Sequence, residues 1–247
     1  MKFFWSGKTA LITGGNCSIA LSLAKLLMES SITPYLTYRS EESRALIEET
    51  LGNNSDNYFT VNLDYSDPAT LDNIDLLNQN AFDYLVDFAQ GDFESLVASA
   101  DDDKIDAFID ESIGFRAKLL KKITRNMLPK KNGRLLFISS TAAKMPNKGQ
   151  GFYSAVKLAG EALYKNIGLE LGGKGITTMS LRPGYVNSGR GEKYILKNKN
   201  EVFNKIPVGM ALTSSEIAET IMFFLSDSAR GFNATEIVMD GGLTSGK

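Results

Sequence analysis

Short apolar runs alternate along the chain with stretches in which apolar residues recur every three to four positions. The runs are typical of buried strands, and the recurring stretches are typical of amphipathic helices. The predicted strands are Thr9–Thr13, Thr33–Tyr38, Asn57–Leu63, Phe82–Phe88, Gly133–Ser140, Ile176–Leu181 and Thr235–Met239. Because helical stretches alternate with these strands, the pattern predicts an α/β fold, a doubly wound parallel sheet of about seven strands in three α/β/α layers.

The longest helical stretch spans Asp101 to Met127, with aspartates at its start and basic residues at its end, the order that a helix dipole favours. From Tyr185 to Thr213 the pattern is irregular, and we expect a flexible substrate lid over about residues 185–213. Thr213 and Glu216 then give a capping signal for a helix over Ser214–Leu225. Since no repeat or linker interrupts the pattern, we expect one domain over residues 1–247.

Composition narrows the chemistry that the chain can perform. It contains no histidine, which excludes Ser-His and Cys-His nucleophile systems and histidine-ligated metals. The single cysteine, Cys17, excludes an intrachain disulfide and a multi-cysteine metal site, and it favours a reducing, cytoplasmic location. We therefore expect no metal, and acid–base chemistry falls to Tyr, Lys, Asp or Glu. The net charge of −2 and the lack of a long apolar run indicate neither a nucleic-acid nor a membrane partner.

A glycine turn joins the first predicted strand to the first helical stretch. The strand ends in Gly14-Gly15-Asn16, and the helical spacing begins at Ser18. This arrangement aims backbone N–H groups and the positive helix end at an anion, which is how dinucleotide pyrophosphates are held. A plain strand–helix connection gives the same pattern, so the turn alone leaves both interpretations open.

Tyr153 and Lys157 are four residues apart in a helical stretch, which places both side chains on one face. A neighbouring ammonium favours the phenolate form of a tyrosine, so that such a tyrosine can exchange a proton with a substrate oxygen. An exposed Tyr/Lys pair on an amphipathic helix is the alternative.

Taken together and in order, several motifs resemble the short-chain dehydrogenase/reductase family along essentially the whole chain. They are Thr13-Gly14, Asp64 after the third strand, Ser139-Ser140 at the end of the fifth, Tyr153-x-x-x-Lys157 thirteen residues after Ser140, Pro183-Gly184-Tyr185-Val186-x-Ser188 and Asp240-Gly241-Gly242. The resemblance implies a Rossmann-type fold and hydride transfer between a nicotinamide cofactor and a carbonyl or alcohol.

The resemblance also implies roles for individual residues. Tyr153 is expected to protonate the carbonyl oxygen as hydride arrives, Lys157 to assist Tyr153 and hold the nicotinamide ribose, and Ser140 to orient the substrate oxygen. Capping of a strand end is the alternative for Ser140. The expected cofactor contacts are Gly14, Asn16, Ser18, Ile19, Arg39, Ser40, Asp64, Tyr65, Ala89, Tyr153, Lys157, Pro183, Gly184, Val186 and Ser188.

The glycine turn departs from the family pattern, because Ser18 and Ala20 replace its second and third glycines. The resulting Ser-Ile-Ala segment resembles bacterial enoyl-acyl-carrier-protein reductases. Those enzymes place six residues between the catalytic Tyr and Lys, whereas Gly160 stands at that distance from Tyr153 here. The three-residue spacing to Lys157 therefore favours a carbonyl reductase.

Two further departures involve acidic residues. Asp87-Phe88-Ala89-Gln90 stands where the family has Asn-Asn-Ala-Gly, and Asp87 is either a solvated loop acid or a buried acid that needs a donor partner. Aligned on Gly114, the family's catalytic asparagine falls on Glu111. Glu111 could take part in a proton relay from Lys157, or it could be a surface helix residue in a shifted register.

The end of the second strand bears on the choice of cofactor. It carries Tyr38-Arg39-Ser40, and a guanidinium with a serine hydroxyl beside it suits a 2′-phosphate. We therefore expect NADP(H) in preference to NAD(H). Pairing of Arg39 with Glu41 or Glu42 is the alternative.

The substrate is less strongly encoded. A basic cluster, Lys121, Lys122, Arg125, Lys130 and Lys131, either docks an acyl carrier protein or forms a solvated face. Apolar lid residues, Tyr185, Tyr194, Ile195, Leu196 and Phe203, suit an acyl chain or a lid that closes on itself.

We predict an NADP(H)-dependent reductase of a small-molecule carbonyl, most plausibly a 3-oxoacyl thioester. The alternatives are a reductase or dehydrogenase of a secondary metabolite and a nucleotide-binding regulator with little turnover. The resemblance implies a homotetramer or homodimer, formed through the long central helices and the C-terminal helix and strand.

Overall fold

The described residues, 3–52, 57–76 and 82–245 of a computed structural model, form one seven-stranded parallel sheet in the order β3-β2-β1-β4-β5-β6-β7. The strands are β1 (Thr9–Thr13), β2 (Thr33–Tyr38), β3 (Phe59–Asn62), β4 (Tyr84–Asp87), β5 (Gly133–Ile138), β6 (Ile176–Pro183) and β7 (Thr235–Met239). All six strand pairs are parallel, as the alternation of strands and helices predicted.

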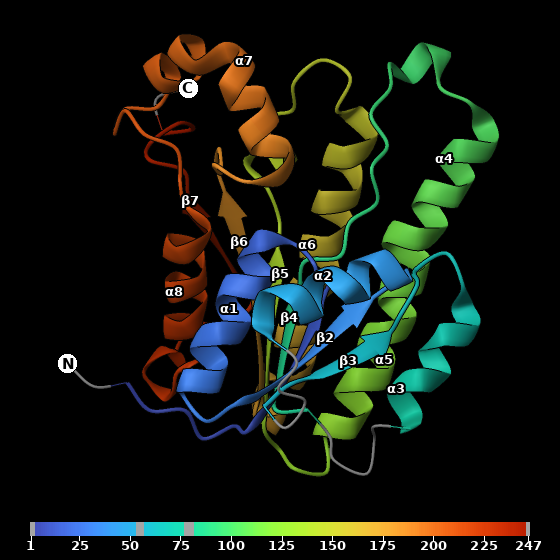
Figure 1. The fold of residues 1–247 in the computed structure, drawn as a ribbon. Coiled ribbons are helices and arrows are strands. Elements are labelled where there is room, and N and C mark those ends of the chain that lie inside the picture. The colour runs from blue at the N-terminus through green and yellow to red at the C-terminus, as the bar shows by residue number, and fades with distance from the viewer. Residues whose placement is uncertain (1–2, 53–56, 77–81, 246–247) are drawn as a thin grey trace.

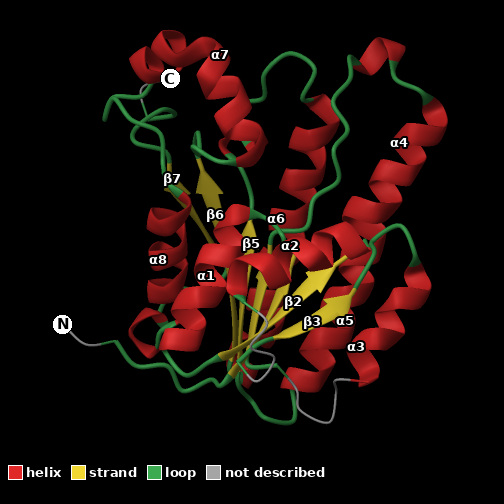
Figure 2. Cartoon of the chain, in the orientation of Figure 1, coloured by secondary structure: helices red, strands yellow, loops and turns green. Residues whose placement is uncertain are grey.

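Helices cover both faces of the sheet (Figures 1 and 2). They are α1 (Ser18–Glu29), α2 (Glu41–Leu51), α3 (Asp72–Leu76), α4 (Asp102–Ile109), α5 (Arg116–Met127), α6 (Gly151–Leu171), α7 (Gly189–Lys205) and α8 (Ser214–Leu225). Successive strand residues point to opposite faces, so Ile12 packs with α1 and α8 while Leu11 packs with α5 and α6. The three-layer α/β/α prediction is confirmed.

β3 and β4 are shorter than their apolar runs predict. β4 pairs with β1 only from Tyr84 to Asp87, although the apolar run continues to Phe82 and Phe88. Phe82 is buried and Phe88 packs against the core, but their backbone lies outside the strand. Apolar character therefore marks burial here and not the length of the strand.

The segment 185–213 is more regular than expected. It contains α7, a helix with a kink at Asn198, and a small apolar cluster built from Ile195, Val202, Ile206 and Ala211. The sequence pattern did not predict this helix, because glycines and polar residues mask the helical spacing. Its role as a flexible lid remains a prediction.

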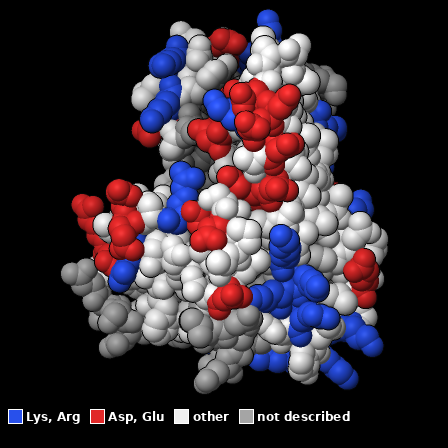
Figure 3. Space-filling model, turned by 90° about the vertical axis from the view of Figure 1, so that its right-hand side faces the viewer, with Lys and Arg blue, Asp and Glu red and all other residues white. Residues whose placement is uncertain are grey.

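The predicted helix from Asp101 to Met127 is divided by a π-helical turn, Asp110–Phe115, between α4 and α5. Such a turn adds one residue and changes which side chains face the sheet. The face along these two helices is acidic over α4 and basic over α5 (Figure 3).

Neither a membrane span nor a metal site occurs in the described part of the chain. No helix there combines the length and apolar character needed to cross a membrane. Nor does any group of three or more Cys, Asp or Glu residues there form a candidate metal site.

Candidate functional site

A cavity of about 540 Å³ opens at the carboxyl ends of β1 to β4. The chain order reverses between the neighbouring strands β1 and β4, and open α/β sheets bind ligands at this switch point. Six of the expected cofactor residues line it: Gly14, Asn16, Arg39, Asp64, Tyr65 and Ala89. Further wall residues come from α4 and the π turn: Lys104, Ala107, Phe108, Glu111 and Ser112.

The turn after β1 is built for close approach. Gly14 has a φ of +64°, and a Cβ there would lie 3.1 Å from the Ala89 backbone. A Cβ on Gly15 would lie 2.6 Å from Leu36 Cβ, so neither position accommodates a side chain easily. The turn therefore brings the N-terminus of α1, with Ser18 and Ile19 in its first turn, to the strand ends where an anion can bind.

The carboxylates next to Arg39 have other partners. Glu41 pairs with Arg44 at 3.7 Å, and the Ser40 hydroxyl holds the pKa of Glu42 below its ordinary value. The exposed Arg39 is thus left facing the cavity, and the alternative of an Arg39–Glu41 or Arg39–Glu42 pair is not what the structure shows.

Asp87 is buried and has donor partners, which decides between the two alternatives for this residue. Its carboxylate accepts from Arg116 Nε at 2.8 Å, Thr13 Oγ1 at 2.6 Å, Tyr164 Oη at 3.1 Å and Tyr65 Oη at 3.4 Å. Burial opposes the charge, but the Arg116 guanidinium and the Thr13 hydroxyl hold the pKa of Asp87 below its ordinary value.

Arg116 extends this network to the cavity wall. Its Nη atoms donate to the backbone oxygens of Ser112 in the π turn and Ala89 after β4. Asp87 and Arg116 therefore connect the ends of β1 and β4 to the π turn. Together they fix the backbone that surrounds the cavity.

Gln90 and Ser112 form a second contact in this wall. Gln90 Nε2 donates to Ser112 Oγ at 3.2 Å, while Gln90 Oε1 is buried and accepts no hydrogen bond. A buried acceptor without a donor is costly, so this end of the amide suits a ligand that carries N–H or O–H groups. The glycine turn, the helix N-terminus and this amide together fit a dinucleotide.

Tyr153 and Lys157 meet at the end of β5. Lys157 is 2% exposed, its Nζ donates to Ile138 O at 2.8 Å, and Nζ lies 5.7 Å from the Tyr153 ring centroid. Tyr153 is partly exposed, whereas the Lys157 ammonium is held inside the protein. The pair is therefore not an exposed surface coincidence.

Ser140 lies at the start of a short 3₁₀ helix, Thr141–Ala143, that packs on α6. Its Oγ accepts from Ala142 N at 3.1 Å and so caps this 3₁₀ helix, whereas capping of the strand end was the alternative expected from the sequence. A hydroxyl that accepts one hydrogen bond still has a proton to donate, and both roles are compatible.

The segment after β6 is tied down at several points. Gly184 N donates to Met239 O at 2.9 Å, and Asn187 N donates to Leu212 O at 2.8 Å. Pro183, Val186 and Ser188 lie in this segment, and Ser188 is the residue before α7. These contacts hold the expected nicotinamide-end residues in a defined loop beside α7.

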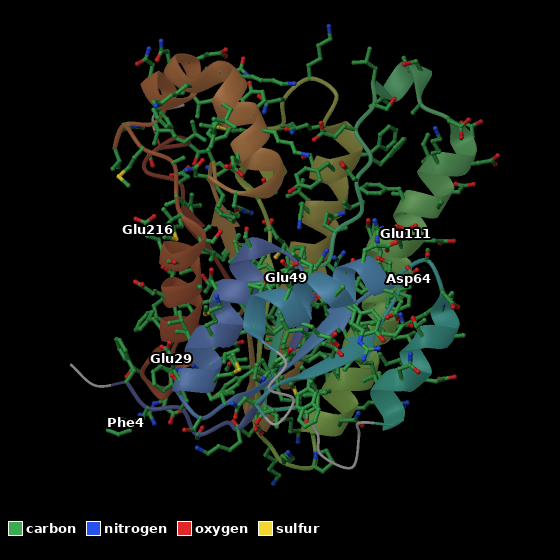
Figure 4. The ribbon with its side chains drawn as sticks, viewed as in Figure 1. Phe4, Glu29, Glu49, Asp64, Glu111 and Glu216 are labelled. Atoms are coloured by element: carbon green, nitrogen blue, oxygen red, sulfur yellow. The ribbon has the colours of Figure 1, made fainter. Side chains whose placement is uncertain are left out.

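Glu111 belongs to the π turn and faces the same cavity as Arg39 and Asp64 (Figure 4). Burial and the Asp64 carboxylate raise the pKa of Glu111, and Arg39 opposes them. Its role in a proton relay from Lys157 stays a prediction.

Sequence reasoning missed Arg116, Gln90 and Ser112. A signal for Arg116 was present, because it stands on the apolar helix stripe with Leu119, Leu120 and Ile123, which are buried. A charge in an apolar stripe needs an opposite charge, and Asp87 at the end of a buried strand is such a partner. Gln90 and Ser112 had no comparable signal.

Comparisons with known proteins agree with this geometry. A family model described as enoyl-(acyl carrier protein) reductase matches residues 14–244. The 3-oxoacyl-[acyl-carrier-protein] reductase FabG of Vibrio harveyi is 26% identical over 240 residues, covering 96% of this chain and 97% of the relative. FabG of Buchnera aphidicola subsp. Baizongia pistaciae is 28% identical over 240 residues, with the same shares covered.

Solved structures share the fold. A gluconate 5-dehydrogenase from Burkholderia cenocepacia, in complex with NADP and tartrate, superposes with a TM-score of 0.88 at 23% identity, over 98% of this chain and 96% of the other. A short-chain dehydrogenase/reductase family oxidoreductase from Burkholderia thailandensis gives 0.87 at 22% identity, over 98% and 94%.

Proposed function

Since the chain belongs to the short-chain dehydrogenase/reductase family of nicotinamide-dependent oxidoreductases, we propose that it uses NADP(H) to reduce the ketone of a 3-oxoacyl thioester to an alcohol. The observation that carries this proposal is the Tyr153–Lys157 pair at the end of β5. There a phenol lies over a buried ammonium whose position is fixed by Ile138 O.

In the proposed reaction, Ser140 Oγ donates a hydrogen bond to the ketone oxygen and orients it towards Tyr153. The bound nicotinamide supplies the hydride. As the C=O π bond breaks, Tyr153 gives its phenolic proton to the oxygen, which becomes the alcohol. The Lys157 ammonium stabilises the phenolate that remains until Tyr153 is protonated again.

The preference for NADP(H) is supported by the cations and donors near the end of β2. Arg39 faces the cavity with Ser43 and Asn16, and Asn16 Nδ2 donates to Ser43 Oγ at 3.3 Å. A guanidinium beside hydroxyl and amide donors suits the 2′-phosphate of NADP(H). The solved gluconate 5-dehydrogenase contains NADP, but at 23% identity that likeness concerns the fold.

An acyl substrate is supported by the surface around Tyr153. Leu96 and Val97 are 50% and 68% exposed, and Val97 lies beside Gly151 at the start of α6. In α7, Tyr194 and Leu196 are 43% and 73% exposed. Exposed apolar groups of this kind suit an acyl chain, and the curated relatives are named 3-oxoacyl reductases.

A carrier protein is a candidate donor of the acyl group. In the basic cluster, Lys122 contacts Asp72 at 3.7 Å and Lys130 contacts Asp83 at 3.8 Å, whereas Lys121, Arg125 and Lys131 are exposed. The exposed cations can attract an acidic carrier.

Self-association is supported by the same face. The exposed aspartates of α4 and the exposed basic residues of α5 would meet if two copies paired these helices in antiparallel fashion (Figure 3). α6 also exposes Leu158 and Leu169, at 45% and 68%. We extend the proposal to a homodimer or homotetramer.

A nucleotide-binding regulator is the second candidate. It is favoured by the acids at positions 87 and 111, where the family pattern has amides. The test is oxidation of NADPH and NADH by the purified protein with 3-oxoacyl-coenzyme A, 3-oxoacyl carrier protein and simple ketones. Turnover with 3-oxoacyl substrates and NADPH supports the main proposal. Tight NADPH binding without turnover on any substrate would favour the regulator.

A further inference from the structure

Two carboxylates, those of Asp64 and Glu111, line the same cavity and interact electrostatically. Asp64 follows β3, and Glu111 belongs to the π turn between α4 and α5 (Figure 4). Their separation in the chain shows that the fold, and not local sequence, brings them together. The Glu111 carboxylate lies close to Gly91: a Cβ atom added to Gly91 would be 3.2 Å from Glu111 Oε2.

Both carboxylates have acceptor capacity to spare. The hydrogen bonds to Asp64, from Ser66 N at 2.9 Å and Ser66 Oγ at 2.7 Å, both go to Oδ1. Within the described residues, no donor reaches Asp64 Oδ2 or either oxygen of Glu111. Ionised carboxylates in a partly buried wall are stabilised by N–H donors between them.

Among the described residues, the nearby cations do not supply hydrogen-bond donors to the Asp64 and Glu111 carboxylates. Arg39 and Lys104 also line the cavity, but they suit the phosphates of the cofactor that the family uses. The Gln90 amide, with its unpaired buried oxygen, is a further acceptor in the same wall. This end of the cavity therefore combines acceptors that require a ligand rich in donors.

Asp64 stands where the family resemblance implies an acid that contacts the cofactor's adenine. We propose that Glu111 accepts the second N–H of the adenine 6-amino group, so that Glu111 is a specificity-determining residue for the base. An exocyclic amino group has two N–H donors, and two carboxylates on opposite sides can accept one each. A 6-oxopurine has an acceptor in that position and would face two anions. The inference rests on the proposed cofactor binding, and it assigns Glu111 a role in recognising the adenine base.

The test compares binding of NADPH with binding of its hypoxanthine analogue, in which a 6-oxo group replaces the 6-amino group. Calorimetric Kd values are measured for the wild type, Glu111→Gln and Glu111→Ala. Wild-type protein should prefer NADPH. Glu111→Gln should reduce the preference by about tenfold or more, because its amide can donate to the 6-oxo group and the charged acceptor is gone.

Asp110→Asn is the matched control, since Asp110 is an exposed acid of the same π turn. It should leave the ratio of the two Kd values unchanged. Glu111→Ala should also lower the preference, and it covers the case in which Glu111→Gln does not fold.

An equal change in both Kd values for the Glu111 variants would overturn the inference while leaving cofactor binding intact. Wild-type protein that binds neither dinucleotide would overturn the inference together with the proposed function.

Discussion

Arg116 Nε donates to Asp87 Oδ2 over 2.8 Å, and both side chains are fully buried. The pair lies between the sheet and α5, and its other contacts reach Thr13 at the end of β1, Tyr164 on α6 and the backbone of the π turn. A buried ion pair is stable only when hydrogen bonds satisfy both charges, and these contacts do so. The pair therefore joins the cofactor end of the sheet to the helix that carries Tyr153.

Removal of the Arg116 side chain should leave the buried Asp87 carboxylate without its opposite charge. Arg116→Met is expected to lower the free energy of unfolding by about 3–5 kcal/mol, measured by urea denaturation. Adding Asp87→Asn to this variant should restore part of the loss, because no charge then remains buried. Arg125→Met, an exposed position on the same helix, should change stability by less than about 0.5 kcal/mol. Purely additive effects of the two core substitutions would contradict a coupled pair.

The same pair should appear in the pH dependence of stability. Because the pKa of Asp87 lies below the ordinary value of 3.8, the native state binds this proton less readily than the unfolded state. The contribution of Asp87 is therefore fully present above about pH 4 and is lost as the pH falls through its native pKa. The Arg116→Met, Asp87→Asn double variant should show a shallower loss of stability on acidification. An unchanged acid profile would show that Asp87 is not a source of this dependence.

Arg39 should determine the choice between NADP(H) and NAD(H). Arg39→Gln is expected to weaken NADPH binding by about tenfold or more and to leave NADH binding nearly unchanged, because in the proposed complex the guanidinium contacts only the 2′-phosphate. Arg44→Gln is the matched control, since Arg44 is bound to Glu48 at 2.9 Å and to Glu41. Calorimetry with both dinucleotides measures the effect. An equal loss of affinity for NADPH and NADH would show that Arg39 acts as a general positive charge and not as a contact to the 2′-phosphate.

Ser140 should contribute to rate more than to cofactor binding. Ser140→Ala is expected to lower kcat by about 10²-fold, because the hydrogen bond to the ketone oxygen is lost. Ser140→Thr keeps the hydroxyl and should retain more activity than the alanine variant. If Ser140→Ala lowered only the melting temperature, with kcat unchanged, the hydroxyl would be a cap alone.

The sequence was sufficient where a local pattern determines the structure. The seven parallel strands, the glycine turn at Gly14 and the capping box of Thr213 and Glu216 follow from periodicity and turn chemistry. The environment of Asp87 was left open between two alternatives, because its partner Arg116 stands 29 positions further along the chain and the charge in the apolar stripe was not used to pair them. Only the packing of α5 on β4 brings the two together.

The surroundings of Glu111 could not be predicted from the sequence for a different reason. Its position relative to Gly114 is clear in the sequence, but no local residue pattern predicts the π turn that carries it. The helix α7 was missed for a related reason, since its apolar residues pack into a small separate cluster with Tyr185 and Phe203. Tertiary packing decided both features.

The central claim is that Tyr153 transfers the proton in an NADPH-dependent ketone reduction. The most direct test compares single-turnover NADPH oxidation by the wild type and Tyr153→Phe, with a 3-oxoacyl-coenzyme A substrate and saturating cofactor. We predict a loss of rate of about 10²- to 10⁴-fold in Tyr153→Phe, with NADPH binding retained, because only the transferable proton is removed. A Tyr153→Phe rate within a few-fold of the wild type would contradict the account.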